Sequence, residues 1–391
     1  MQHNISSHIE NIKLALANQT GSIKNVSYET GLLGLSLFYC YYAKYTGEEE
    51  YLNHANECFS QALASLDLGN FKRVYQTDSL DCHLSHLGRF IGFCQTYKLL
   101  ELDAEDYLLK IDQILSDLMA SKIAMGNFDL NSGALAAGYY FLSRPPIETV
   151  NQQLSILIRA IAAKAKTDAD GDYYWDVPTL ANKVYLGISH GSALIISFVS
   201  NAYERGIEPG RCQEIILRAS NFLLKQKMRY KKGLFPNYIG DSEPDFKQFS
   251  LCYGDLGIGY ALYRSAVLLD NRQLMGSAKE ILEDCLTRKK EDGLTFDASL
   301  TYGAAGLAET FDKLYRLCGD KRFKAAADYW YQKIPDYAVN ENKFAGYRTK
   351  LVGAGDLWNV SFGWGIIGIG ISLMRSIDER LPPIDALLSV A

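Results

Sequence analysis

The chain lacks the features that mark several large classes of protein. Its eight cysteines are scattered without a Cys-x-x-Cys pair, so no disulfide framework is expected, and the thiols are predicted to be buried small apolar side chains. No block of Lys and Arg is long enough to neutralise a row of phosphates, and the net charge is −5, which argues against nucleic acid as a partner. The longest apolar run, at 360–374, is about fifteen residues and broken by glycine, shorter than the roughly 20 that a membrane helix needs. Residues 1–19 show no charged segment followed by an apolar core, so we expect a cytoplasmic protein without a secretory signal.

The composition is that of a globular protein with a large core. The 391 residues are 48% hydrophobic and 22% charged. This length often indicates two or three domains, but that expectation does not hold for chains built from repeats. We therefore predict a single domain over residues 1–391.

A short motif that opens an apolar helix recurs seven times along the chain. Its copies lie at 29–42, 83–97, 130–142, 188–199, 251–263, 300–311 and 362–374. Aligned on one small residue, the copies are 48 to 63 residues apart, which leaves room for two helices per repeat. The aligned residues are Gly31, Ser85, Gly133, Gly191, Gly254, Gly303 and Gly365.

Two kinds of helix are predicted from the apolar pattern. The motif helices are apolar almost all round, whereas segments between them, such as 212–228, carry a single apolar stripe. Helices apolar all round are buried and striped helices lie outside them, so the pattern predicts an all-α chain forming an α/α toroid of seven inner and seven outer helices. The final segment, 379–391, is expected to supply the last outer helix. The N-termini of the inner helices would gather at one end, where free N–H groups favour anions.

The residues just before each motif glycine are the candidates for a functional site. The fourth motif has His190 there, the fifth Cys252 with Tyr253, and the sixth Thr301 with Tyr302. Asp129 stands four residues before the third glycine. The second motif has His83, with Cys82 and His86 beside it, which we interpret as a chance cluster and not as a metal site.

The motifs "LGISHG" and "CYGDLGIG", together with the sevenfold glycine pattern, resemble the lanthionine synthetase C-like family over nearly the whole chain. The resemblance implies enzymes that add a peptide cysteine thiol to dehydroalanine or dehydrobutyrine and so close thioether rings. It further implies a zinc ion held by the Cys of a "CYG" motif and by a later Cys-His pair, with a His and an Asp nearby. By position, Cys252 matches the first zinc ligand, His190 the histidine and Asp129 the acidic residue.

The chain departs from the family pattern at the Cys-His pair. Thr301 and Tyr302 stand in its place, and Gln248 stands where the family has an arginine. A catalytic zinc needs three protein ligands, and Cys252 is the only family ligand left. The sequence therefore predicts that no zinc or other cofactor is bound.

Three functions remain open on these grounds. The first is a zinc-independent lanthipeptide cyclase acting on a dehydrated precursor peptide, with His190 as acid–base residue, Asp129 orienting it and Tyr302 hydrogen-bonding the enolate oxygen. The second is a non-catalytic scaffold that binds a modified peptide or a partner dehydratase. A glycoside hydrolase is the third, but it needs two carboxylates, for which only Asp129 and Asp255 are candidates.

Each candidate also has a purely structural interpretation. Cys252 would be a packed small side chain, His190 a hydrogen-bonded core histidine, and Asp129 the cap of the next helix.

Overall fold

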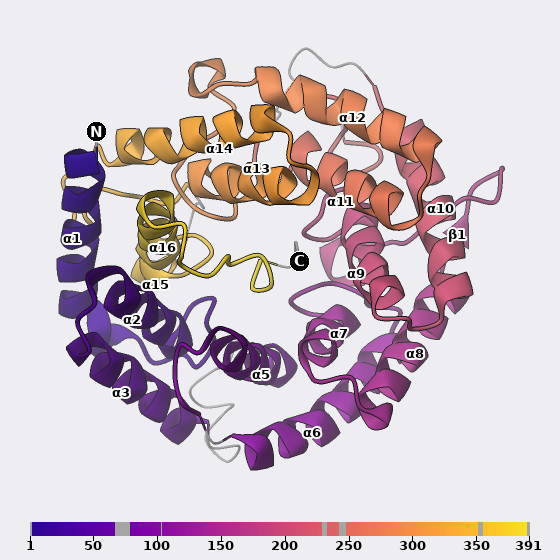
Figure 1. Cartoon of the computed structure of the whole chain (residues 1–391). Coiled ribbons are helices and arrows are strands. Elements are labelled where there is room, and N and C mark those ends of the chain that lie inside the picture. Colours follow the sequence, from indigo (N-terminus) through magenta and orange to yellow (C-terminus); the bar gives the residue numbers. More distant parts are fainter. Residues whose placement is uncertain are drawn as a thin grey trace. The chain divides into compact units, whose positions relative to one another are not determined.

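The computed structural model describes residues 2–66, 79–102, 104–228, 233–241, 248–350 and 355–388. These residues are mostly helical (Figure 1). The α-helices are α1 Gln2–Gln19, α2 Leu32–Thr46, α3 Glu50–Ser65, α5 Leu80–Tyr97, α6 Glu105–Ala124, α7 Ala134–Ser143, α8 Glu148–Ala163, α9 Ser192–Glu204, α10 Pro209–Lys225, α11 Asp255–Leu268, α12 Arg272–Thr287, α13 Ala304–Cys318, α14 Lys321–Lys333, α15 Asp356–Val360 and α16 Ile366–Ile377. The short elements are 3₁₀ helices Thr20–Ser22, Pro178–Leu180, Lys290–Asp292 and Ile334–Tyr337, and antiparallel strands β1 Lys166–Thr167 and β2 Tyr173–Tyr174.

The chain divides into two compact units, which we describe separately. Unit 1 contains residues 1–104 and 295–388, and unit 2 contains residues 105–294. Unit 1 includes the helix pairs α2/α3, α13/α14 and α1/α16, and unit 2 the pairs α7/α8, α9/α10 and α11/α12. That the chain is one domain remains a prediction.

Each of the seven motifs coincides with a helix in the described residues. These motif helices are α2, α5, α7, α9, α11, α13 and α16, and six of them begin directly after the aligned glycine. The alignment of the second motif on Ser85 is wrong, because α5 already begins at Leu80 and Ser85 lies inside it. A serine has the Cβ atom that this turn cannot accommodate, so the chain continues as helix through that position.

The glycines are required by a close approach of the backbone. A Cβ atom at Gly133 would lie only 2.7 Å from the carbonyl oxygen of Asn127, six residues earlier. The N–H of Ala134, the first helical residue, donates to that same oxygen at 2.9 Å. In the fourth motif, Ser192 likewise donates to the Tyr185 carbonyl at 3.1 Å. The expectation of free N–H groups at these helix starts is therefore wrong here, because each loop uses them itself.

The helices between the motifs have a single buried stripe, as the pattern predicts. On α10 the stripe consists of Cys212, Ile215, Ile216, Ala219, Ser220, Phe222 and Leu223. The motif helix α2, by contrast, is buried without interruption from Leu32 to Ala43. All eight cysteines are free thiols; five are buried as expected, whereas Cys82, Cys252 and Cys318 are only partly so.

The last motif helix is covered by the N-terminal helix and not by the C-terminal segment. α1 packs against α16, with Ile9, Ile12 and Leu16 fully buried, and Figure 1 shows the indigo α1 beside the yellow α16. The prediction of an outer helix at 379–391 is wrong for its described part, which forms turns at 385–388; residues 389–391 lie outside the described residues. Pro382 and Pro383 explain this, since the residue before a proline avoids the helical conformation.

The C-terminal segment is instead buried in unit 1 as irregular chain. Tyr41 donates its hydroxyl to the Pro382 carbonyl at 2.9 Å, and Tyr28 donates to the Leu387 carbonyl at 3.1 Å. Ile384 has no exposed surface. Buried tyrosine hydroxyls thus satisfy carbonyls that a helix would have satisfied internally.

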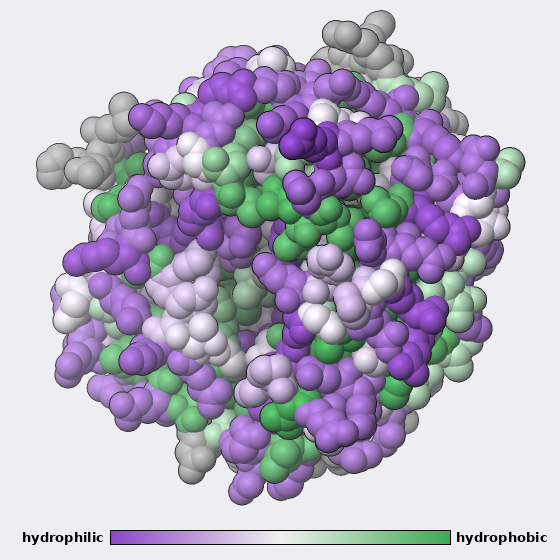
Figure 2. Space-filling view, turned by 45° about the vertical axis from the view of Figure 1, so that its right-hand side comes forward, coloured by the Kyte–Doolittle hydropathy of each residue, from purple (hydrophilic) through white to green (hydrophobic). Residues whose placement is uncertain are grey.

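Hydrophilic residues predominate on the face shown in Figure 2, and hydrophobic residues gather there in smaller areas. Within the described part of the chain, no helix combines the length and apolarity that crossing a membrane requires.

Candidate active site

An aspartate–histidine pair joins two motif loops of unit 2. Asp129 precedes α7 and His190 precedes α9, and the distance from His190 Nδ1 to Asp129 Oδ2 is 2.5 Å. The carboxylate is almost fully buried, with a side chain 4% exposed, whereas the imidazole is 21% exposed. A buried carboxylate that accepts from Nδ1–H fixes the ring orientation and leaves Nε2 as the proton-accepting atom.

In four other motifs, the residue at the position of Asp129 is a serine that accepts a hydrogen bond within its own loop. Four residues before the motif glycine, a serine Oγ accepts the N–H of the residue just before that glycine. The four serines and their distances are Ser27 (3.0 Å), Ser250 (3.1 Å), Ser299 (3.1 Å) and Ser361 (3.1 Å). In the third motif, Asp129 Oδ1 accepts the N–H of Ser132 in the same way at 3.0 Å. The turn needs one oxygen only, so the second oxygen, which holds His190, is additional to what the fold requires.

The charge state of Asp129 follows from its surroundings. Burial acts to raise the pKa of its carboxyl, but the hydrogen bond and charge of His190 and the donors of Ser132 outweigh burial and lower it. Asp129 is thus an anion at neutral pH, able to stabilise an imidazolium on His190. It does not cap the following helix, whose N-cap is Gly133, so the structural interpretation as a helix cap is wrong.

Two tyrosines lie beside the imidazole. The ring centres of Tyr185 and Tyr253 are 5.9 Å and 6.2 Å from that of His190. Burial raises the pKa of both phenols, so each remains a neutral hydrogen-bonding group. Sequence reasoning did not single out Tyr185. The sequence signal for it is that Tyr185 lies six residues before Gly191, a position at which five other motifs have Asn, Gln or Asp.

Cys252 belongs to the same unit and its loop is tied to that of His190. Ser189 donates its hydroxyl to the Cys252 carbonyl at 3.3 Å. A Cβ atom at Gly187 would lie 2.7 Å from the oxygen of that carbonyl, so this position accommodates only glycine. The fourth and fifth motif loops are thereby held together, and Cys252 is a partly exposed residue.

Thr301 and Tyr302 lie in unit 1, before α13. The backbone N–H and the hydroxyl of Thr301 both donate to the Gly363 carbonyl at 2.9 Å. The N–H of Tyr302 donates to Ser299 Oγ, as in the other serine-containing motifs. The Thr301 hydroxyl is therefore engaged in joining two loops.

Comparison with known proteins identifies the family. The lanthionine synthetase C-like protein model matches residues 22–388. The chain belongs to this family. Nine solved chains are similar, among them one titled nisin cyclase, which is 16% identical, with 99% of this chain and 98% of that chain covered at a TM-score of 0.74. This likeness shows the fold class, an all-α α/α toroid. The search of curated proteins finds no match.

The residues at the family's zinc positions do not fit a zinc ion. Within the described ranges, no group of three His, Cys, Asp or Glu side chains close enough to share a metal contains Cys252. A threonine hydroxyl committed to a carbonyl and a tyrosine do not replace a thiolate and an imidazole. We therefore derive no step of the chemistry through zinc.

Two other groupings considered from the sequence are also accounted for. Asp255 is 1% exposed, lies 2.5 Å from an Arg288 nitrogen and accepts backbone N–H groups of Leu234 and Phe235, so it cannot serve as a second glycosidase carboxylate. In α5, Cys82 Sγ lies 3.9 Å from His86 Nε2, and no potential metal-binding trio among the described residues includes them.

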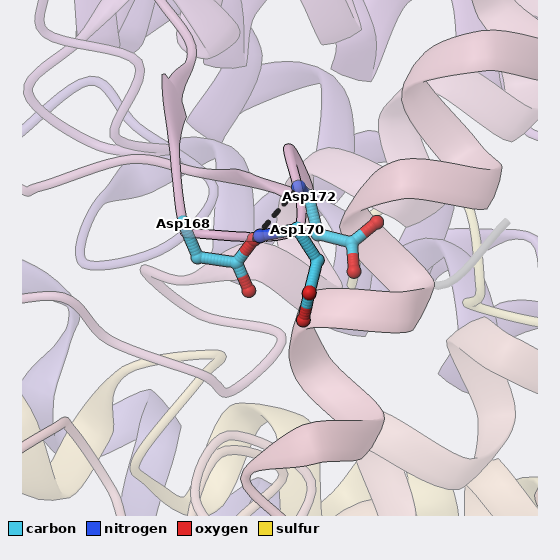
Figure 3. A group of neighbouring side chains, drawn as sticks. All are labelled: Asp168, Asp170 and Asp172. Carbon is cyan, nitrogen blue, oxygen red and sulfur yellow. Dashed lines mark hydrogen bonds between the residues drawn. The ribbon is translucent and has the colours of Figure 1, made fainter.

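The turn between β1 and β2 carries one cluster of three carboxylates, Asp168, Asp170 and Asp172 (Figure 3). The ammonium group of Lys225 lies 2.8, 2.6 and 2.6 Å from these three carboxylates. The cluster thus already surrounds a cation supplied by the chain, and we assign it a structural role.

Proposed function

We propose that this protein is a zinc-independent lanthipeptide cyclase. It would add a cysteine thiol of a dehydrated precursor peptide to dehydroalanine or dehydrobutyrine, forming lanthionine or methyllanthionine. The observation that carries the proposal is the second oxygen of Asp129, which the turn does not need and which holds His190 at 2.5 Å. Family membership and the fold shared with a nisin cyclase support the same class of reaction.

The reaction is feasible without metal on energetic grounds. A thiol of pKa about 8.5 is roughly 3% ionised at pH 7, which costs a factor of about 30 in rate. A positioned general base typically contributes about 10²–10⁴, enough to offset that loss. The thiolate sulfur attacks Cβ of the alkene, the π electrons move to the carbonyl as an enolate, and Cα then takes up a proton.

His190 and Asp129 have defined parts in this scheme. The Nε2 atom of His190 removes the thiol proton or, as imidazolium, protonates the enolate, and Asp129 orients and stabilises the ring. We assign Tyr302 a hydrogen bond to the enolate oxygen from its motif position alone. A partner dehydratase and a cytoplasmic location belong to the same proposal.

The second candidate is a scaffold that binds the modified peptide or the dehydratase without catalysing ring closure. The observation in its favour is that Thr301, at a family ligand position, uses its hydroxyl to join two loops. A scaffold would bind the peptide but leave its cyclisation at the uncatalysed rate.

The decisive experiment compares variants in a direct count of rings. Unreacted thiols of a dehydrated precursor are blocked, and the mass of the peptide is measured by mass spectrometry to count the rings. An enzyme-free control gives the rate of spontaneous cyclisation. His190→Ala should reduce the rate by about 10²–10⁴. Asp129→Ser restores the residue found in four other motifs, so the turn should persist while the rate falls. Asp129→Asn should cost less than His190→Ala.

Cys252→Ala is the matched control, and it should change the rate little because one cysteine cannot hold a catalytic zinc. An essential Cys252 combined with a dispensable His190 would contradict the proposal. A wild-type rate equal to the enzyme-free control, with tight binding of precursor or dehydratase, would favour the scaffold.

A further inference from the structure

Tyr185 of unit 2 lies six residues before its motif glycine, where other motifs have a side chain that hydrogen-bonds within its own loop. In the third motif, Asn127 Oδ1 accepts the N–H of Asp129 at 3.1 Å, and in the sixth, Asp297 Oδ1 accepts the N–H of Ser299 at 2.9 Å. Of the residues that the structure describes, none is hydrogen-bonded to the Tyr185 hydroxyl. This hydroxyl, like the second oxygen of Asp129, is therefore additional to what its loop requires.

Contacts within unit 2 hold Tyr185 beside the imidazole of His190. The Tyr185 carbonyl accepts the N–H of Ser192, and the residue forms an antiparallel β-bridge with Tyr238. The ring centres of this bridged pair are 5.3 Å apart, and the ammonium group of Lys183 lies 3.8 Å from the centre of the Tyr238 ring. The Tyr185 ring also meets the His190 ring edge to face, at an interplanar angle of 66°. Tyr185 is thus held in place by packing and remains partly exposed to solvent.

The two phenols beside His190 differ in what their hydroxyls contact. Burial raises the pKa of the Tyr253 phenol, and a hydrogen bond with the Ser189 side chain opposes this effect. The Tyr253 hydroxyl is therefore already engaged within the protein. Burial likewise raises the pKa of the Tyr185 phenol, against the charge of Lys183, so this hydroxyl keeps its proton at neutral pH. A protonated phenol without an acceptor can donate a hydrogen bond to a substrate oxygen.

We propose that Tyr185 is a further catalytic residue, whose hydroxyl donates a hydrogen bond to the enolate oxygen formed during thioether ring closure. This inference rests on the proposed function. The enolate oxygen and Cα, which takes up the proton, are only two bonds apart, so their partners must lie side by side, as Tyr185 and His190 do. Both residues belong to unit 2. The enolate oxygen has room for a second donor, so the inference does not depend on Tyr302.

The addition is balanced with His190 as the residue that exchanges a proton with the substrate. The S–H bond breaks as Nε2 of His190 takes the proton, and the sulfur electron pair forms the bond to Cβ of the dehydrated residue. The π electrons move to the carbonyl oxygen, whose negative charge the Tyr185 hydroxyl stabilises while it keeps its own proton. The imidazolium then gives its proton to Cα. Removal of one donor from a developing oxyanion typically lowers kcat by about 10²–10³.

The test compares ring formation by wild type, Tyr185→Phe and the control Tyr174→Phe. Tyr174 is a partly exposed tyrosine of β2 in the same unit, and its ring stacks on Phe222. Tyr185→Phe keeps the ring beside His190 and removes only the hydroxyl, so kcat should fall by about 10²–10³ with little change in KM. The relative loss should be the same at every pH, since the proton transfers of His190 are unaltered. Tyr174→Phe should match wild type.

Outcomes for this inference and for the proposed function are distinct. An active wild type with a Tyr185→Phe loss of less than about tenfold, or with a displaced pH profile in Tyr185→Phe, overturns the role of Tyr185 alone. A wild type no faster than the enzyme-free control overturns both.

Should Tyr185→Phe fail to fold, 3,5-difluorotyrosine at position 185 replaces it, because it keeps the shape of the ring and ionises at lower pH. An ionised phenol cannot donate, so the rate should fall as pH rises through the pKa of this phenol. A rate that follows the wild-type profile over that range overturns the assignment.

Discussion

Asp129 shows at the scale of one residue how a structural position takes on a second role. Serine at the equivalent place in other motifs offers one oxygen to the turn, whereas the aspartate offers one to the turn and one to His190. The sequence shows that Asp129 stands near the third motif. The family resemblance names His190 as the residue that Asp129 orients, and the structure shows the two side chains 2.5 Å apart although they are separated by 61 residues in the chain.

This pairing predicts a pH-dependent contribution to stability. The folded-state pKa of Asp129 is lowered, so its stabilising effect is fully present above the unfolded pKa, near 3.8, and is lost as pH falls through the folded value. Asp129→Ser should therefore be less stable than wild type by about 1–3 kcal/mol at pH 7, and the difference should shrink below about pH 4.

Urea unfolding at pH 7 and pH 3 measures this difference. Asp106→Ser, at an exposed aspartate of the same unit, should show a much smaller effect at both pH values. A difference for Asp129→Ser that is equally large at pH 3 would mean that its carboxylate charge does not stabilise the fold.

At the scale of elements, the N-terminal helix α1 completes the packing of α16. Ile12 on α1 is fully buried, and its Cγ2 would lie 3.1 Å from a Cβ added at Gly370 of α16. Ile12→Ala should cost about 2–5 kcal/mol in the free energy of unfolding, since it leaves a cavity at this contact. Leu14, two residues on, is 54% exposed, so Leu14→Ala should change stability by less than about 0.5 kcal/mol. Equal losses in urea unfolding would show that α1 does not pack as described.

Metal content is a property of the whole molecule. With a single family ligand remaining, the purified protein should contain far less than one equivalent of zinc, and a chelator should change neither its melting temperature nor its rate of ring formation. Elemental analysis and calorimetry with and without EDTA measure this. Near-stoichiometric zinc that disappears in Cys252→Ala would reveal ligands outside the family positions.

The sequence alone determined the seven motif helices and six of their starting points. Both features are local: each motif glycine contacts a carbonyl a few residues away, and each apolar run repeats at helical spacing. Local features of this kind can be recognised in the sequence. The alignment on Ser85 is wrong because serine is small, as glycine is, and therefore fits the pattern. Its Cβ atom, however, restricts the backbone conformations that are available.

Only the tertiary structure decided which distant segments meet. It placed α1 and not the C-terminal segment against α16, and it joined the Thr301 hydroxyl to the Gly363 carbonyl. Such contacts depend on shape, volume and unsatisfied carbonyls of residues far apart in the chain, so local periodicity does not predict them. The sequence therefore specifies which residue types are available for chemistry, whereas packing determines their partners, their burial and their proton affinities.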